Sequence, residues 1–244
     1  MAAPAISLII PCYNEAALLP RLLASIETAR NAFRGGRDAV EVIVSDNAST
    51  DDTVAIATAH GCRVASTTIR RIGAVRNAGA AIARGTIVAF IDADSQVHPD
   101  TFNQIAAFMA RREIVAGSTG ATMERWSAAI VLTYAMFVPM VWATSIDIGV
   151  IFCRRADFEA IGGYNESMKF AEDVRFLWDL RRLGRSRGSR LARARAAKVI
   201  ASTRKFDQFG DWHYLTIAMR GPWLLLSRRT RDAFANSYWY KSGR

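Results

Sequence analysis

The chain has 244 residues and a mass of 26.9 kDa, which is enough for one large domain or two small ones packed together. Hydrophobic residues make up 51% and charged residues 22%, which excludes a disordered tail and a fibrous protein. The 32 Lys and Arg residues exceed the 22 Asp and Glu residues by +10, and this excess favours anionic partners such as phosphorylated ligands, phospholipid surfaces or nucleic acid.

The cysteines and the amino terminus indicate a reducing compartment. Cys12, Cys62 and Cys153 are odd in number and widely spaced, which argues against a disulfide scaffold and against a zinc ribbon. The first ten residues lack the positive charge with which a secretory signal begins. Together these features predict a cytoplasmic protein.

The first 120 residues alternate between strand-like and helix-like segments. The expected strands are 6–10, 40–44, 63–68 and 86–91, and the expected helices are 16–30, 51–59, 73–83 and 99–110. Repeats of this length are typical of a parallel sheet covered by helices on both faces and joined by right-handed crossovers. The predicted fold class is therefore α/β, a Rossmann-like and mostly parallel sheet.

Beyond residue 120 the alternation fails, because 128–146 is a run of 19 residues without a charge. Its length reaches that of a membrane-spanning helix. Pro139 interrupts the run and Asp147 follows it directly, so we expect a buried or interfacial helix instead.

Two further elements are expected after that run. A strand is predicted at 149–152 and a helix at 170–183. The helix carries the acidic pair Glu172-Asp173 in its first turn and is expected to end at Gly184 as its C-cap.

Basic residues are concentrated in the C-terminal third, where 14 basic and two acidic residues lie between Arg181 and Arg231. Nucleic-acid binding would require aromatic residues among the arginines, and 185–195 has none. A plain solvated helix is one alternative. Attachment to an anionic membrane surface fits best, since 128–146 and 223–226 supply apolar residues for it.

Polar residues follow three predicted strands at the edge of the sheet where open α/β folds bind ligands. The segments are Pro11-Cys12-Tyr13-Asn14-Glu15, Ser45-Asp46-Asn47-Ala48-Ser49-Thr50-Asp51-Asp52, and Asp92-Ala93-Asp94. A basic protein therefore concentrates carboxylates where its fold binds a ligand.

Asp92 and Asp94 lie two residues apart at the end of an apolar strand. In extended chain such residues project to the same side, so both carboxylates can reach one ligand. Two such oxygen donors suit Mg²⁺ or Mn²⁺ beside a pyrophosphate. A strand-end turn, in which Asp is common, explains the same residues without a metal.

Two other segments have the chemistry of nucleotide binding. Asp46 at a strand end can accept the N–H of a pyrimidine base, and Ser49 or Thr50 is expected to cap the next helix. Glycines at 73 and 79 surround Arg76 at an expected helix start, where amides and a guanidinium can hold phosphate. A tight turn with a surface arginine is equally compatible with that segment.

Five motifs in this order resemble those of family 2 glycosyltransferases with a GT-A fold. They are Pro-Cys-Tyr-Asn-Glu, Ser-Asp-Asn-Ala-Ser-Thr-Asp-Asp-Thr, Arg-Asn-Ala-Gly, Asp-Ala-Asp, and Gly-Gly-Tyr followed by Glu-Asp. The resemblance implies a GT-A domain at 1–210 with a nucleotide-binding half at 1–120 and an acceptor half at 121–210. A basic helical extension would occupy 211–244.

The resemblance also implies roles for individual residues. Those implied to bind substrate are Pro11, Tyr13 and Glu15 in the nucleotide pocket, Asp46 on the base, Arg76 near the phosphates, Asp92 at the ribose or metal, and Glu172. Asp94, with Asp92, would coordinate Mg²⁺ or Mn²⁺, and His213 is a candidate third ligand from a C-terminal lid. Asp173 would be the catalytic base of an inverting displacement.

The implied activity is transfer of one sugar from a nucleotide-diphosphate sugar, with UDP the expected nucleotide, to a hydroxyl acceptor. Lipid-linked and cell-envelope acceptors are candidates, with the enzyme on the inner face of the cell membrane. The Gln-x-x-Arg-Trp signature of processive synthases is missing, which favours a single transfer.

Two alternatives remain beside that activity. A nucleotidyltransferase would carry a Gly-rich, basic loop where Cys-Tyr-Asn-Glu stands. A non-enzymatic basic adaptor for membrane or nucleic acid, on a degenerate scaffold, is disfavoured because four candidate site carboxylates are intact. These are Asp46, Asp92, Asp94 and Asp173.

Overall fold

The computed structural model describes residues 3–168 and 171–213. The strands are β1 (Ile6–Cys12), β2 (Val40–Asp46), β3 (Arg63–Ser66), β4 (Ile87–Phe90), β5 (Ile114–Ser118), β6 (Ala121–Met123), β7 (Ile151–Arg154), β8 (Arg190–Arg193) and β9 (Val199–Ala201). The helices are α1 (Leu19–Asn31), α2 (Thr53–Ala59), α3 (Ile72–Ala81), α4 (Thr101–Met109), α5 (Ala128–Thr144), α6 (Arg155–Ala160), α7 (Glu172–Ser186) and α8 (Arg204–Phe209). Short 3₁₀ turns lie at Arg37–Ala39 and Arg195–Ala197.

The chain divides into two compact units. The first comprises Met1–Thr122 and Ser145–Ala201, and the second Met123–Thr144 and Ser202–Arg244. These units do not coincide with the ranges 1–210 and 211–244 expected from the sequence, and that domain assignment stays a prediction. Most of the expected extension at 211–244 lies outside the described residues.

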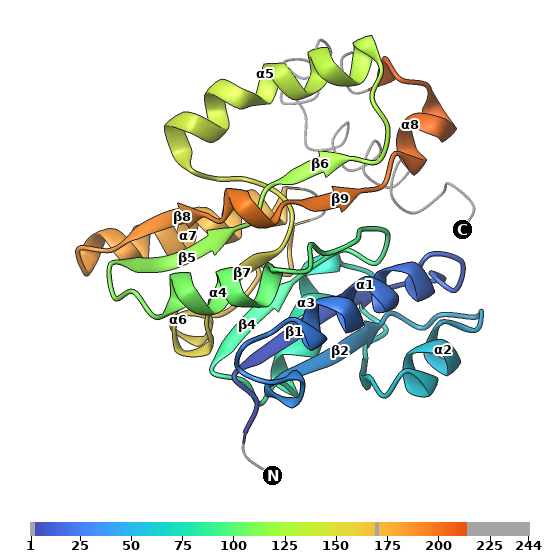
Figure 1. The fold of residues 1–244 in the computed structure, drawn as a ribbon, viewed down its shortest axis with the longest axis horizontal. Coiled ribbons are helices and arrows are strands. Elements are labelled where there is room, and N and C mark those ends of the chain that lie inside the picture. Colours follow the sequence, from blue (N-terminus) through green and yellow to red (C-terminus); the bar gives the residue numbers. More distant parts are fainter. Residues whose placement is uncertain (1–2, 169–170, 214–244) are drawn as a thin grey trace. The chain divides into compact units, whose positions relative to one another are not determined.

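The first unit is built on one sheet whose strands run in the order β3-β2-β1-β4-β7-β5-β8 (Figure 1). β1, β2, β3 and β4 are mutually parallel, as are β5 and β8, while β7 is antiparallel to both of its neighbours. The predicted α/β class with a mostly parallel sheet is confirmed. The antiparallel β7 was not expected from the strand–helix alternation.

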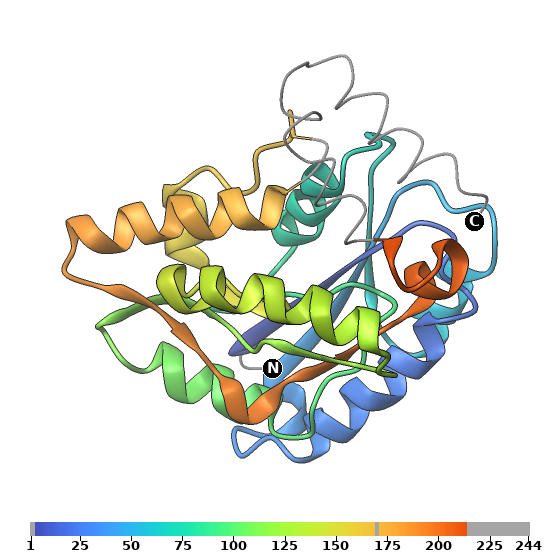
Figure 2. The ribbon, with the colours of Figure 1, turned by 90° about the horizontal axis from the view of Figure 1, so that it is seen from above.

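Helices cover both faces of this sheet, as predicted. Figure 2 shows α3 and α7 on one side of the strands and α1 and α4 on the other. Alternate residues of β1 belong to separate hydrophobic cores on the two faces of the sheet. Leu8 and Ile10 pack with α1 and α4, whereas Ile9 packs with α3 and α7. Strands that are buried on both faces read as continuous apolar runs, which is why β1 was visible in the sequence.

Pro11 does not end the first strand, although the sequence analysis ended that strand at Ile10. β1 pairs with β2 through Cys12–Asp46, but it pairs with β4 only as far as Ile9–Phe90. Beyond Ile9 one side of β1 is therefore an edge, where a residue without an N–H group is tolerated.

The C-terminal helix of the main unit differs from the expectation at its end. α7 continues through Gly184 to Ser186, and the left-handed glycine that follows it is Gly188 (φ +68°). A Cβ atom on Gly184 would lie 2.7 Å from Cγ1 of Val115. Gly184 therefore permits close packing of α7 on β5 rather than capping the helix.

Strands β5, β6, β8 and β9 were not predicted, because each is short and gives little periodic signal. In β8 only Leu191 and Ala192 are buried, and arginines flank them. Part of the basic segment, for which a solvated helix was one alternative, is thus a strand paired with β5.

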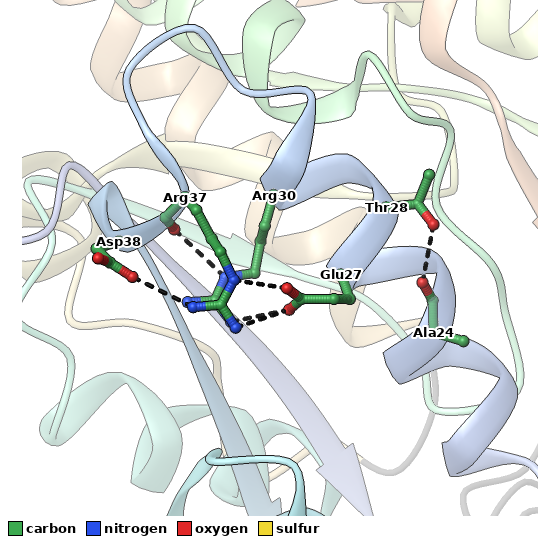
Figure 3. A network of polar contacts seen from close by, with 6 residues as sticks. All are labelled: Ala24, Glu27, Thr28, Arg30, Arg37 and Asp38. Atoms are coloured by element: carbon green, nitrogen blue, oxygen red, sulfur yellow. Dashed lines mark hydrogen bonds and ion pairs between the residues drawn. The ribbon is translucent and has the colours of Figure 1, made fainter.

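An exposed ionic network joins the end of α1 to the turn before β2. Figure 3 shows Arg37 between Glu27 and Asp38, with Arg30 on the same carboxylate of Glu27. Such surface pairs contribute little to stability individually, so this network positions the turn more than it holds the fold.

The second unit contains α5 and α8. Arg125, just before α5, donates to Asp207 and Asp211 through its Nε and Nη atoms, with separations of 2.5 to 3.0 Å. This pairing connects the two chain segments that make up the unit.

Helix α5 is the apolar segment that the sequence analysis expected to be buried or interfacial. Its buried residues are Ala129, Ile130 and Thr133, whereas six of its large apolar side chains are exposed, with Trp142 at 70%. Among residues 3–168 and 171–213, no helix is both long enough and apolar enough to cross a bilayer.

Candidate active site

The carboxyl ends of β1, β2 and β4 bring the polar segments to one edge of the sheet. Asp46 is the last residue of β2 and lies opposite Cys12, the last residue of β1. Asp92 follows the end of β4 by two residues. Since these strands are parallel, their carboxyl ends form a single rim, as the sequence analysis expected.

The loops after β1 and β2 are joined by hydrogen bonds from one loop to side chains of the other. The Asn14 N–H donates to Ser49 Oγ at 2.9 Å, and the Thr50 N–H donates to Asn14 Oδ1 at 2.8 Å. The Glu15 N–H donates to Thr53 Oγ1 at 2.8 Å. The expectation that Ser49 or Thr50 caps α2 is therefore wrong, because Asp52 is the residue before the helix. Ser49 and Thr50 instead fix the shape of the rim.

The residues expected to line the nucleotide pocket lie on this rim. Asp46 and Glu15 are buried, and Asp46 accepts the Ser49 N–H at 3.3 Å. Tyr13 is half-buried, and the guanidinium carbon of Arg70 lies 5.1 Å from the centre of its ring. Pro11, in β1, lies next to them in the chain. Whether these residues bind a nucleotide stays a prediction.

Arg76 lies one turn inside α3 rather than at the start of the helix. The glycines around it serve packing: a Cβ atom on Gly79 would lie 2.5 Å from Cγ2 of Ile9, and one on Gly73 would lie 3.2 Å from the carbonyl oxygen of Asn165. Ser45 Oγ also donates to the Val75 carbonyl at 2.5 Å. Helix α3 is thereby pressed against the sheet, and Arg76 is carried on a rigid support.

The guanidinium of Arg76 contacts three carboxylates. Nη1 donates to Glu172 Oε1 at 3.0 Å and to Asp173 Oδ1 at 2.7 Å, and Nη2 donates to Asp92 Oδ1 at 2.9 Å. The first two acids come from α7 and the third from the loop after β4. Residues from both halves of the chain are thus brought together. Asp92 and Asp173 were both expected in the site, but a contact of each with Arg76 was not.

The three acids differ in exposure and therefore in what they can do. The side chain of Arg76 is 4% exposed and that of Glu172 is 11%, whereas Asp173 is 32% and Asp92 is 56% exposed. Burial raises the pKa of Asp173, and the charge of Arg76 opposes that rise. A carboxyl with a raised pKa beside a pocket has the properties of a general base.

A pocket of about 150 Å³ opens beside this cluster, entirely within the first unit. Asp92 and Asp173 line it, together with Ser95 and the turn at Ile148 and Gly149. The turn precedes β7, whose reversed direction brings its start to the carboxyl end of β4. A small polar group can therefore contact both acids at once.

Tyr164 is a member of the cluster to which the sequence analysis assigned no role. Its ring lies 5.1 Å from the guanidinium carbon of Arg76 and stacks on Phe176 at 4.0 Å. Asn77 holds it in place by accepting the Tyr164 N–H and donating to the Tyr164 carbonyl, both at 2.9 Å. The signal that could have found it is the Gly162-Gly163 pair before it, since both glycines have φ above +70°.

The residues expected to hold a metal ion lie in different surroundings. Asp92 lines the pocket, and Asp94 is half-buried in the turn that follows. His213 belongs to the second unit, where its ring stacks on Phe209 with 4.8 Å between centroids. Within the described residues, no group of three or more His, Cys, Asp or Glu side chains could hold a metal ion.

The family model described as Glycosyl transferase family 2 matches residues 7–136, more than half of the chain. A relative from Mycobacterium tuberculosis (strain ATCC 25177 / H37Ra), named PGL/p-HBAD biosynthesis glycosyltransferase, is 32% identical over 191 residues, covering 73% of this chain and 69% of its own length. The chain belongs to glycosyl transferase family 2. The resemblance of its motifs to this family is thereby confirmed.

Solved structures show the same fold as this family 2 glycosyltransferase. Mannosyltransferase PcManGT from Pyrobaculum calidifontis, in complex with GDP-Man and Mn²⁺, has a TM-score of 0.63 at 24% identity and is matched over 79% of this chain and 55% of its own. Glucosyl-3-phosphoglycerate synthase from Mycobacterium tuberculosis, with Mn²⁺, UDP and phosphoglyceric acid, has a TM-score of 0.59 at 23% identity, over 86% of this chain and 74% of its own. This chain therefore spans little more than half the length of the mannosyltransferase.

Proposed function

We propose that this family 2 glycosyltransferase moves one sugar from a nucleotide-diphosphate donor, with UDP the expected nucleotide, to a hydroxyl acceptor, with inversion and with the help of a divalent ion. The observation that carries the proposal is the convergence of Asp92 and Asp173 on one pocket at the carboxyl rim of the sheet. Solved relatives in fold are complexes with UDP or GDP-Man and Mn²⁺, which supports this class of donor.

The donor would lie along the rim formed by the loops after β1 and β2. Asp46 would accept an N–H of a pyrimidine base, and the ring of Tyr13, against which Arg70 lies, would line the same pocket. Pro11 and Glu15 would complete the walls of this part of the site. The inter-loop bonds of Asn14 keep the rim in shape before the donor arrives, which reduces the entropy lost on binding.

Asp92 and Asp94 would hold a Mg²⁺ or Mn²⁺ ion. The fit is chemical: Asp92 uses Oδ1 toward Arg76 while more than half of its side chain stays exposed, and two carboxylates leave coordination positions for phosphate oxygens and water. When bound, the ion would supply positive charge against the negative charge that develops on the departing diphosphate. His213 as a further ligand stays part of this proposal.

Asp173 would act on the acceptor. Its carboxylate takes the proton of the acceptor hydroxyl while the acceptor oxygen bonds to the anomeric carbon and the bond from that carbon to the diphosphate breaks. Its first-turn position on α7 places it near amide N–H groups that favour the ionised form, whereas burial raises its pKa. A base of this kind contributes typically about 10²–10⁴-fold to the rate.

The acceptor side of the proposal includes a membrane surface, with a lipid-linked hydroxyl among the candidate acceptors. Helix α5 has no charged residue, and its exposed large apolar side chains are Val131, Leu132, Met136, Phe137, Met140 and Trp142. Apolar residues of this kind on a chain with a net charge of +10 have the composition of a helix that lies in an anionic lipid interface. The enzyme would then work on the inner face of the cell membrane.

The experiment that tests the proposed activity combines donor binding with a base variant. Calorimetry with Mn²⁺ and a panel of UDP-glucose, UDP-N-acetylglucosamine, UDP-galactose and GDP-mannose should identify a donor that binds. Asp173→Asn should bind that donor with unchanged affinity and lose at least about 100-fold in the rate of sugar transfer.

Asp179→Asn is the matched control, because Asp179 lies on the same helix and its carboxylate pairs with Arg175 at 2.7 Å. It should transfer at the wild-type rate. Full turnover by Asp173→Asn would remove Asp173 as the base, and absence of binding by every nucleotide sugar would contradict the proposed function.

A further inference from the structure

Arg76 is the centre of a charge cluster that has more acid than base. One guanidinium is in contact with three carboxylates, those of Asp92, Glu172 and Asp173, and the ring of Tyr164 lies against it. Only 4% of its side chain is exposed. Such a residue has little surface left to offer to a ligand.

We propose that Arg76 is a positioning residue, which holds the base Asp173 in place opposite Asp92 across the pocket, rather than a ligand of the donor phosphates. This inference rests on the proposed function, since it assigns a role within the same reaction. The resemblance to the family implied that Arg76 lies near the donor phosphates, whereas in the structure Arg76 donates to three carboxylates.

Arg76 lines the pocket, but most of its N–H groups are not available to a phosphate. Nη1 donates to Glu172 and Asp173 and Nη2 donates to Asp92, with separations of 2.7 to 3.0 Å, and Nε is buried. A phosphate that took two N–H groups of this guanidinium would have to displace an acid, whose charge would then be left against the protein. Removing a partner from a buried charge is costly. Asp92 and Asp173, in contrast, keep exposed surface on the pocket side.

The start of α7 carries Asp173 and follows an unusual backbone conformation. Asp173 is the second residue of α7, and Ala171, the residue before the helix, has a φ of +58°, which is uncommon for a residue other than glycine. Arg76 sits on α3, which is packed on the sheet through Gly79 and bonded to it through Ser45. The bond between Arg76 and Asp173 therefore ties the start of α7 to a helix that is packed on the sheet and bonded to it.

The neighbouring residue on α3, Asn77, bonds twice to the backbone of Tyr164. The ring of Tyr164 lies against Arg76, 5.1 Å from its guanidinium carbon. Arg76 and Asn77 thus hold Asp173 and Tyr164 from one helix. Placement matters for catalysis, because a shift of about 1 Å in a reacting group can cost about 100-fold in rate.

The test separates binding from turnover with two variants. In Arg76→Gln, the affinity for UDP in the presence of Mn²⁺ should change by less than about threefold, while kcat for the donor selected by the panel falls at least about 100-fold. Arg76→Lys, which keeps a charge but not the fork of donors, should recover at least about tenfold of that loss. Arg182→Gln, an exposed change on α7, should match the wild type in both measurements.

The opposite split would overturn the positioning role. If Arg76 bound phosphates, loss of its charged hydrogen bonds would weaken UDP binding by at least about tenfold and leave kcat nearly unchanged. If Arg76→Gln does not fold, Arg76→Lys carries the test, with a fall in kcat of about tenfold at constant affinity as the expected result. A wild-type protein that binds no sugar nucleotide would instead contradict the proposed function itself, so the two failures are distinguishable.

Discussion

Glu41 and Asp92 show how the partners of a carboxylate decide whether it serves structure or chemistry. Glu41 accepts hydrogen bonds from Ser7 Oγ, Arg63 Nη1 and the backbone N–H groups of Arg84 and Gly85, all within 3.2 Å. Asp92 accepts a hydrogen bond from Arg76 through Oδ1, and the remainder of its carboxylate lines the pocket. Glu41 therefore holds chain segments together near the start of β2, and Asp92 is available to a ligand.

The first prediction concerns Glu41→Gln. Four donors lose a charged acceptor, so the free energy of unfolding should fall by about 2–3 kcal/mol at pH 7 in urea denaturation. Burial acts to raise the pKa of Glu41, but hydrogen bonds from Ser7, Arg84 and Arg63 outweigh it and keep the pKa below its ordinary value. A lowered pKa means that this stabilisation is present above the ordinary value near 4.5 and is lost as the pH falls below it.

The difference between wild type and Glu41→Gln should accordingly shrink when the measurement is repeated at pH 4. Glu27→Gln is the control, because Glu27 pairs with Arg37 on the surface, and it should cost less than about 1 kcal/mol. Equal losses for the two variants at pH 7 would contradict the structural role assigned to Glu41.

Asp94 is proposed to hold the divalent ion, and thermal unfolding in the presence of UDP and Mn²⁺ tests this role. UDP with Mn²⁺ should raise the melting temperature of the wild type more than UDP alone, because a bound ligand stabilises the folded state. Asp94→Ala should abolish the part of the rise that depends on Mn²⁺. Asp38→Ala, a change at a fully exposed acid, should keep it; an undiminished rise in Asp94→Ala would remove Asp94 from the metal site.

At the scale of elements, the sequence predicted those with long apolar runs and missed those without. β1 and β2 are buried on both faces and α1 carries a clear apolar stripe, so each was found. β8 buries two residues between arginines, and β7 reverses direction for reasons that lie in its neighbours in space. Local patterns cannot report such tertiary pairing.

The candidate site was predictable to the same extent. Asp46, Asp92 and Asp173 were found because they stand at ends of strongly patterned elements. The contacts of Arg76 with Asp92 and Glu172, which lie 16 and 96 residues away in the chain, were not predicted, because no local signal specifies them. The glycines near Arg76 were compatible with phosphate binding or with a tight turn, and the structure shows that Gly79 allows α3 to approach the sheet at Ile9.

The loop before Tyr164 gives an element-scale prediction. Gly162 and Gly163 both have left-handed φ angles, of +77° and +72°, but only Gly163 is crowded: a Cβ atom there would lie 2.7 Å from Asn77 Oδ1 and 2.9 Å from Phe158 Cζ. Gly162→Ala should cost about 1 kcal/mol of unfolding free energy through backbone strain alone. Gly163→Ala should cost at least about 2 kcal/mol more, measured by urea denaturation.

Because that loop leads to Asp173, the proposed base, the two variants should also differ in turnover. Gly163→Ala should lower the rate of sugar transfer, while Gly162→Ala should leave it near that of the wild type. Equal stability of the two would show that Asn77 and Phe158 can move aside, and the loop would then be less tightly held than its contacts imply.

At the scale of the whole molecule, a net charge of +10 and the exposed apolar residues of α5 lead to a prediction about lipid. The wild type should co-sediment with vesicles rich in phosphatidylglycerol and less with phosphatidylcholine alone. Phe137→Ser combined with Trp142→Ser should lower the affinity for vesicles at least about tenfold, because each substitution removes a large ring that would be buried in the lipid.

Trp178→Ser is the control for that experiment, because Trp178 is a similarly exposed tryptophan on α7 in the other unit. It should bind vesicles like the wild type. Equal binding by the α5 double variant would exclude α5 as the lipid contact, even if the charge of the chain still attracts anionic vesicles.

The path of the chain through residues 123–144 has a consequence for how such an enzyme can change. The chain leaves the first unit after Thr122 and returns to it at Ser145, so the segment that carries α5 is an excursion between β6 and β7. Lengthening, shortening or exchanging an excursion leaves the strand registers on either side intact. If the proposed function holds, grafting this stretch from one relative onto another would change the acceptor side and leave the rim at the ends of β1 and β2 unaltered.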